Sequence, residues 1–208
     1  MALLSIQSPG CLKIQDGERV FEGADQEWYS KTWQRRAGCG PTVASMIAWY
    51  LSKTRPGCRA LSENPDNSKE SMLKLMDDVW EYVTPGYRGV NSTGILVKGF
   101  KDYANSKGIS LRINFLDIGL DKSRRQDYSE IAGFISSAIE NDCPVAFLNL
   151  HNGEEKVLDR WHWVLLVSFC SGTGKAVIID QGKSFEIDIL LWLSTTILGG
   201  GFVYADII

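Results

Sequence analysis

The chain has 208 residues, of which 44% are hydrophobic and 23% are charged, and its formal net charge at pH 7 is −3. This composition is near the average for globular proteins and supplies enough apolar residues for one core, so we expect a single domain over residues 1–208. The charge is slightly acidic and no run of five basic residues occurs, which argues against nucleic-acid binding.

The sequence also bears on where the protein is located and on the redox state of its cysteines. The first ten residues lack the basic start and long apolar core of a signal peptide, and the longest apolar run is too short to span a bilayer. The five cysteines show no CxxC and no Cys/His spacing for zinc, which argues against a disulfide framework and a structural metal. We therefore expect a cytoplasmic protein without a cofactor and without a membrane partner.

In chain order, the apolar patterns predict helices first and strands later. Loops rich in turn-forming or charged residues are expected at residues 55–67 and 117–126. The predicted helices cover residues 40–52, 68–83, 94–106 and 128–140, and the predicted strands cover residues 110–116, 144–150, 161–169, 176–180 and 202–207. This segregation predicts an α+β fold, with a helical half over about residues 26–141 and an antiparallel sheet over about residues 144–208.

Cys39 lies at the start of the first predicted helix, in the sequence Gly38-Cys39-Gly40-Pro41-Thr42. Pro41 suits the first turn of a helix, where its missing N–H costs nothing. The unpaired N–H groups and the positive dipole end would favour a thiolate and an oxyanion beside it. Cys39 is thus a candidate nucleophile, although a free cysteine is also a common buried residue, the role we expect of the other four.

Only two histidines are available as a base, and His162 lies at the start of a predicted strand. The next predicted strand ends at Asp180, and residues 171–174 read as the turn between the two strands. In an antiparallel hairpin the early part of one strand lies opposite the late part of the other, so His162 and Asp180 are expected to be neighbours. The alternatives are a satisfied core histidine and a turn-forming aspartate. We expect His151, which begins a polar loop, to be a surface residue.

Four features together resemble the papain-like cysteine peptidases, and most closely the bacterial peptidase C39-like group. They are the helix start Cys39-Gly40-Pro41-Thr42, a glutamine upstream of it, His162 and Asp180. The resemblance covers about residues 26–182. It implies a papain-like fold in which the nucleophile helix packs on the sheet, and a Cys-His-Asp triad in which Cys39 attacks a carbonyl carbon, His162 moves the proton and Asp180 orients the imidazole.

The resemblance also implies an oxyanion hole built from the N–H of Cys39 and a glutamine side chain. Gln34 stands five residues before Cys39, where many papain-like enzymes have six, and it is our assignment; Gln26 is a more distant candidate. The function expected is hydrolysis of peptide bonds in a peptide or protein substrate through a thioester. Two alternatives remain: an acyl or peptidyl transferase with the same triad, and a non-catalytic peptide-binding module.

Overall fold

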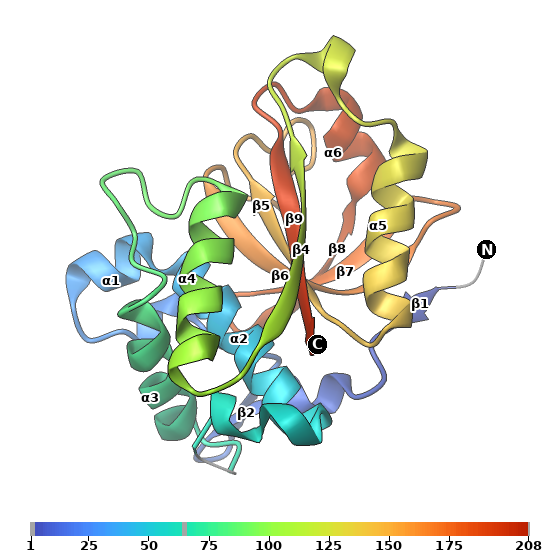
Figure 1. Ribbon diagram of the computed structural model, residues 1–208. Helices are drawn as coiled ribbons and strands as arrows, with labels where there is room; N and C mark the ends of the chain where they lie inside the picture. The colour runs from blue at the N-terminus through green and yellow to red at the C-terminus, as the bar shows by residue number, and fades with distance from the viewer. Residues whose placement is uncertain (1–2, 64–65, 208) are drawn as a thin grey trace.

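The computed structural model describes residues 3–63 and 66–207 and has an α+β architecture with an antiparallel sheet (Figure 1). The sheet runs in the order β4-β9-β5-β6-β7-β8, and the short β1 also pairs with β6. Its strands are β1 (Leu4–Ser5), β4 (Leu111–Ile118), β5 (Val145–Asn149), β6 (His162–Cys170), β7 (Lys175–Asp180), β8 (Lys183–Asp188) and β9 (Gly200–Ile207). A separate two-stranded sheet pairs β2 (Ile14–Asp16) with β3 (Arg19–Phe21).

The helices begin where the sequence supplies caps. Ser68, Ser92 and Asp127 each accept a hydrogen bond from a backbone N–H three residues later, as N-cap residues do. The helices are α1 (Thr32–Ala37), α2 (Cys39–Thr54), α3 (Lys69–Trp80), α4 (Thr93–Ser106), α5 (Tyr128–Glu140) and α6 (Ile189–Thr195), and short 3-10 turns cover Pro9–Leu12, Gln26–Trp28, Pro56–Leu61 and Lys122–Arg124.

The four predicted helices and five predicted strands all occur, with ends that differ by a few residues. The sequence did not predict α1, α6, β8 or the N-terminal strands. Strand β8 was missed because it has only two apolar residues, Phe185 and Ile187, and four of its six residues are exposed. The division into a helical and a sheet half is also looser than expected, because β4 lies in the helical half of the chain but pairs with β9 at the C-terminus.

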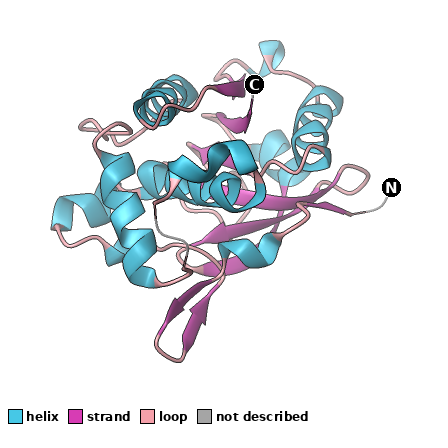
Figure 2. Ribbon diagram, turned by 60° about the horizontal axis from the view of Figure 1, so that its bottom comes forward, coloured by secondary structure: helices cyan, strands magenta, loops and turns pink. Residues whose placement is uncertain are grey.

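Helix α2 lies at the centre of the molecule and positions Cys39. It contacts α3, α4 and strands β5 and β6, and every residue from Gly40 to Leu51 is buried. The structure therefore buries this helix on all sides. Figure 2 shows the helices packed against the strands. Because the core surrounds α2, the position of its first residue is fixed.

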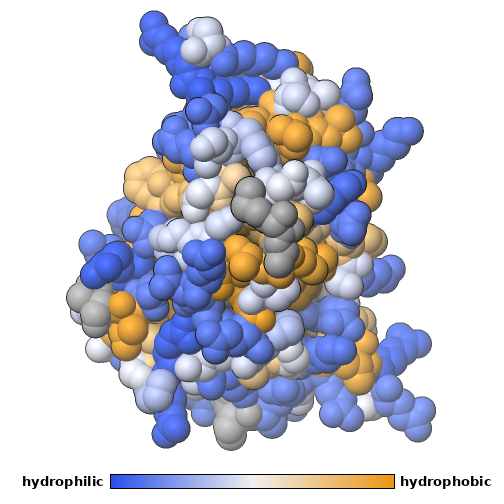
Figure 3. All heavy atoms as spheres, turned by 90° about the vertical axis from the view of Figure 1, so that its right-hand side faces the viewer, coloured by the Kyte–Doolittle hydropathy of each residue, from blue (hydrophilic) through white to orange (hydrophobic). Residues whose placement is uncertain are grey.

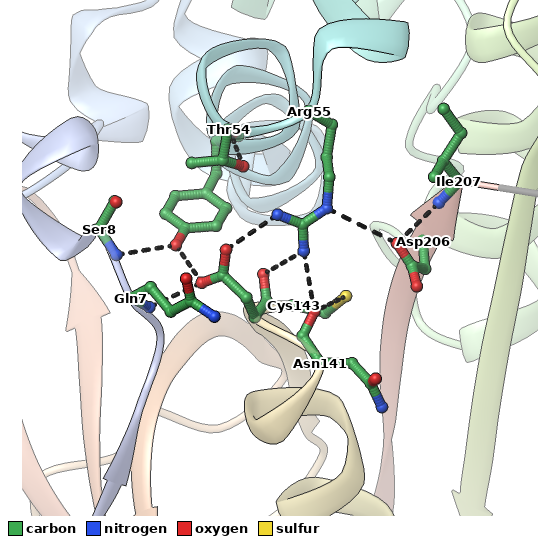
Figure 4. Close-up of polar contacts among 10 residues, drawn as sticks. Gln7, Ser8, Thr54, Arg55, Asn141, Cys143, Asp206 and Ile207 are labelled. Carbon is green, nitrogen blue, oxygen red and sulfur yellow. Dashed lines mark hydrogen bonds and ion pairs between the residues drawn. The ribbon is translucent and has the colours of Figure 1, made fainter.

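A buried polar network joins the ends of the chain to the far end of α2 (Figure 4). Asp142 accepts hydrogen bonds from the backbone N–H of Gln7 at 2.6 Å, from the Tyr50 hydroxyl at 2.5 Å and from Arg55 at 2.9 Å. Arg55 also lies 3.8 Å from Asp206 on β9. The network therefore ties the N-terminal segment, α2 and the last strand to the α5–β5 turn.

The face shown in Figure 3 is mostly hydrophilic, and its hydrophobic side chains form separate patches. Within residues 3–63 and 66–207, no helix combines the length and the apolar character needed to cross a bilayer.

Candidate active site

Cys39 is the first residue of α2 and is only partly buried. Its two neighbours must be small. A Cβ added to Gly38 would lie 2.7 Å from the ring of Tyr29, and one added to Gly40 would lie 2.7 Å from the side chain of Val90. The Gly-Cys-Gly sequence thus lets the chain pass between two packed side chains while the thiol stays at the helix N-terminus, where backbone N–H groups are unpaired.

His162 and Asp180 are brought together as the hairpin argument predicted. His162 is the first residue of β6 and Asp180 is the last residue of β7. The Nε2 of His162 lies 2.7 Å from Oδ1 of Asp180, and the two side chains are only 10% and 13% exposed. With Nε2–H donating to the carboxylate, Nδ1 is the ring nitrogen left to exchange a proton with a thiol.

A β-bulge in β6 places these two side chains on the same face of the sheet. Leu165 and Leu166 pair with Ile179 and Ile178, but after the bulge Ser168 pairs with Val177. Continuing the first register toward the strand ends places Asp180 opposite Val164, two residues from His162 and therefore on the same face. Without the extra residue in β6, Asp180 would stand opposite Leu165 and point to the other face.

The electrostatics of the imidazole follow from its contacts. Burial opposes the charged form and would lower the pKa of His162. Hydrogen bonds to Asp180 and to Cys39 outweigh burial and raise that pKa to about 10. The imidazole therefore interacts with both Cys39 and Asp180, and a neutral pH leaves it protonated.

Cys39, His162 and Asp180 line one small cavity, whose space of about 10 Å³ suits a single water-sized group. Gln26 lines the same cavity. Its Nε2 donates to the carbonyl oxygen of Arg35 at 2.7 Å, which uses one of its two N–H donors, and its Oε1 is buried without a partner.

Gln34 occupies a different position from the one that we assigned to it. It is not among the residues that line the cavity, and its side chain makes a hydrogen bond to Asp77 of α3. The reason is that residues Thr32–Ala37 form the separate helix α1, which turns Gln34 toward α3 and buries it. Gln26 reaches the cavity that Cys39 also lines through the fold, and no local sequence pattern marks that arrangement.

The remaining cysteines and His151 lie outside this cavity. Cys58 and Cys143 are buried as expected, and burial raises the pKa of both thiols, that of Cys143 to about 12. Cys11 and Cys170 are only partly buried. His151 is half-buried, so the expectation of a surface residue is met only in part, and its Nδ1 accepts a hydrogen bond from the backbone N–H of Gly153. Across the described part of the chain, no group of three or more His, Cys, Asp or Glu side chains is placed to hold a metal ion.

Compared with models of known protein families and with curated proteins, the chain matches neither.

Proposed function

We propose that the chain is a cysteine peptidase of papain-like type, related to the bacterial peptidase C39-like group, in which Cys39, His162 and Asp180 form the catalytic triad. The observation that carries this proposal is the continuous contact from Cys39 through the His162 imidazole to Asp180. Nucleophile, base and orienting group in hydrogen-bonding sequence are the elements of a triad.

The proposed reaction has two steps, formation of a thioester and its hydrolysis. The imidazole holds the proton of the thiol, and the Cys39 sulfur attacks the carbonyl carbon of a peptide bond. The carbon–nitrogen bond breaks, the imidazolium gives its proton to the departing amine, and a thioester remains. Water then adds to the thioester while the imidazole takes its proton, the carbon–sulfur bond breaks, and the carboxylic acid leaves, which restores the starting pair of thiolate and imidazolium.

We assign the oxyanion contact to Gln26, with the N–H groups at the start of α2 as the other donors. The support is that Gln26 lines the cavity with Cys39, has one side-chain N–H left to donate and borders a space that suits one oxygen-sized group. Donors aimed at a developing oxyanion are the largest single contribution in many such enzymes.

The first test is alkylation of the intact protein with iodoacetamide, with the modified residue located by mass spectrometry. Cys39 is expected to react before Cys11 and Cys170, the other partly exposed cysteines, and His162→Ala should remove that advantage. Equal labelling of the three thiols would contradict a catalytic Cys39.

The second test is bond cleavage. A peptide library made from a tryptic digest is incubated with the wild type and with Cys39→Ala, and new termini are identified by mass spectrometry. Hydrolysis predicts cleavage products that only the wild type forms. Added glycinamide separates transfer from hydrolysis, because a transferase would convert the same acyl groups into amides. If neither product forms while Cys39 remains selectively reactive, the chain is a peptide-binding module and the proposal fails.

A further inference from the structure

We propose that a hollow formed by Trp161 and Arg88 is a substrate subsite that takes an aromatic side chain of the peptide next to the bond that is cut. This inference rests on the proposed peptidase function and adds a substrate class to it. The hollow has a volume of about 460 Å³, and its exposed wall is almost wholly apolar. It is separate from the small cavity in which the triad lies.

Trp161 is held in an unusual position beside the base. It directly precedes His162, and its φ of 57° is rare for a bulky residue and costs free energy that the surrounding structure must offset. Its side chain is 48% exposed, whereas that of Trp163, two residues later, is 1% exposed. A strained backbone that turns a large indole toward solvent beside a catalytic group is a feature of functional sites.

Arg88 is brought to the same place by a tight turn. The backbone N–H of Gly89 donates to the carbonyl of Gly86 at 2.9 Å, and Arg88 lies inside this turn. Two residues later, Val90 packs against Gly40, and its carbonyl oxygen accepts a hydrogen bond from the Trp163 indole at 2.5 Å. The turn is therefore anchored both beside Cys39 and beside His162, so a peptide lying at the thiol passes the hollow.

The chemistry of the two walls selects the occupant. An apolar wall built on an indole favours a large apolar side chain, and it offers no partner for an isolated charge. Arg88 contributes the stem of its side chain to this wall, because the hollow exposes almost no polar surface. The indole adds a preference among apolar side chains, because two aromatic rings pack on each other more favourably than their buried area alone explains. We therefore infer selection for Phe or Tyr over Leu, and for Leu over Ala.

The main test measures how fast Cys39 is alkylated by N-acetylated dipeptide chloromethyl ketones that carry Phe, Leu or Ala at either position, the sulfur displacing chloride. The wild type is expected to react about ten times faster with the best Phe reagent than with its Ala counterpart. Trp161→Ala should bring this ratio close to one. Arg88→Ala removes only part of the apolar wall, so it should lower the ratio of Phe to Ala less than Trp161→Ala does.

The matched control is Trp33→Ala, because Trp33 has the same exposed fraction as Trp161, 48%, and does not line the hollow. It should leave all the ratios unchanged. Iodoacetamide, which carries no side chain, is measured with every variant. If iodoacetamide shows no preference for Cys39, the proposed function has failed, and the hollow is judged by the binding experiment that follows.

The binding experiment detects a subsite that lies on the side of the leaving amine, and it does not require the protein to be catalytically active. Protein labelled with ¹⁵N in tryptophan is titrated with phenylalaninamide and with leucinamide, and the Trp161 indole signal is assigned through Trp161→Phe. A shift of that signal with either amide, larger for phenylalaninamide and reduced by Arg88→Ala, supports the subsite. Two results together would overturn the inference. One is that the Phe preference in alkylation is absent or survives Trp161→Ala, and the other is that neither amide moves the Trp161 signal.

Discussion

The Nε2 of His162 lies 2.7 Å from Oδ1 of Asp180, although 18 residues separate them in the chain. Both belong to the β6–β7 hairpin, one at the start of its first strand and the other at the end of its second. The hairpin therefore holds the imidazole and the carboxylate as one unit, and α2 brings the thiol to it.

The raised pKa of His162 is the most direct test of this contact. Asp180→Asn and Cys39→Ala each remove one hydrogen-bonding partner that stabilises the imidazolium, so each should lower the pKa of His162 from about 10. The chain has only two histidines, so the two imidazole Cε1–H signals are readily separated in a proton NMR titration, with His151→Gln as the assignment control. An unchanged His162 titration in both variants would show that neither group contacts the ring.

The same shift makes the stability of the folded protein depend on pH. The folded pKa of His162 lies above the ordinary value of 6.5, so the stabilisation from this group is fully present below about pH 6.5 and is lost as pH rises toward 10. We expect the difference in free energy of unfolding between wild type and Asp180→Asn to be largest near pH 6, on the order of 2 kcal/mol, and to shrink by pH 10. Urea unfolding at pH 6, 8 and 10 measures it. A difference that stays constant across these three values would contradict the linkage.

The two upstream glutamines should behave differently when each is replaced. Gln26→Ala removes the donor that we assign to the oxyanion and should lower the rate of amide cleavage by about 10²–10³-fold. Gln34→Ala should change that rate by less than about tenfold, but should destabilise the fold by about 1 kcal/mol, because it removes the hydrogen bond of a buried side chain to Asp77, an exposed residue that can bind water instead. Turnover numbers and urea midpoints of the two variants separate these effects. The opposite pattern would return the oxyanion role to Gln34.

The network in Figure 4 should control stability and leave the candidate active site intact. Asp142→Ala leaves the largely buried Arg55 without its main partner and should lower the free energy of unfolding by about 3 kcal/mol. Asp206→Ala is the control, since that pair is longer and more exposed, and it should cost less than about 1 kcal/mol. Iodoacetamide labelling of Cys39 should be the same in both variants, and a loss of labelling in Asp142→Ala would show that the network reaches the thiol.

The network also predicts sensitivity to acid. Burial raises the pKa of Asp142, but hydrogen bonds from Tyr50, Gln7 and Arg55 outweigh it and hold that pKa below its usual range. Stabilisation by this carboxylate is therefore present above about pH 3.9 and is lost as pH falls through the lowered folded value. In Asp142→Ala this part of the acid dependence should be missing, which unfolding curves at pH 5, 4 and 3 would measure.

Sequence patterns predicted the parts of the site that depend on local chemistry. Gly-Cys-Gly-Pro at the head of an apolar run located the start of α2, and two β-branched runs around a glycine-containing turn located His162 and Asp180. The glutamine could not be chosen in this way. Gln34 is nearer in sequence, but α1 turns it toward Asp77, and Gln26 reaches the cavity only through long-range packing. The hollow at Trp161 was equally hidden, because a positive φ at a tryptophan has no signature in composition or periodicity.

The β-bulge between Leu166 and Ser168 limits the changes in length that this hairpin can accept. Residues added at the distal turn, around residues 171–174, leave the pairing near His162 untouched, so that turn is a suitable place for a tag or an affinity epitope. Adding or removing one residue within β6 would instead turn the side chains of one strand to the opposite face of the sheet relative to the other strand. Only a second, compensating change could restore the original arrangement. Distant homologues should therefore tolerate a change in the size of that turn better than a single change in strand length, and changes in strand length should occur only in pairs.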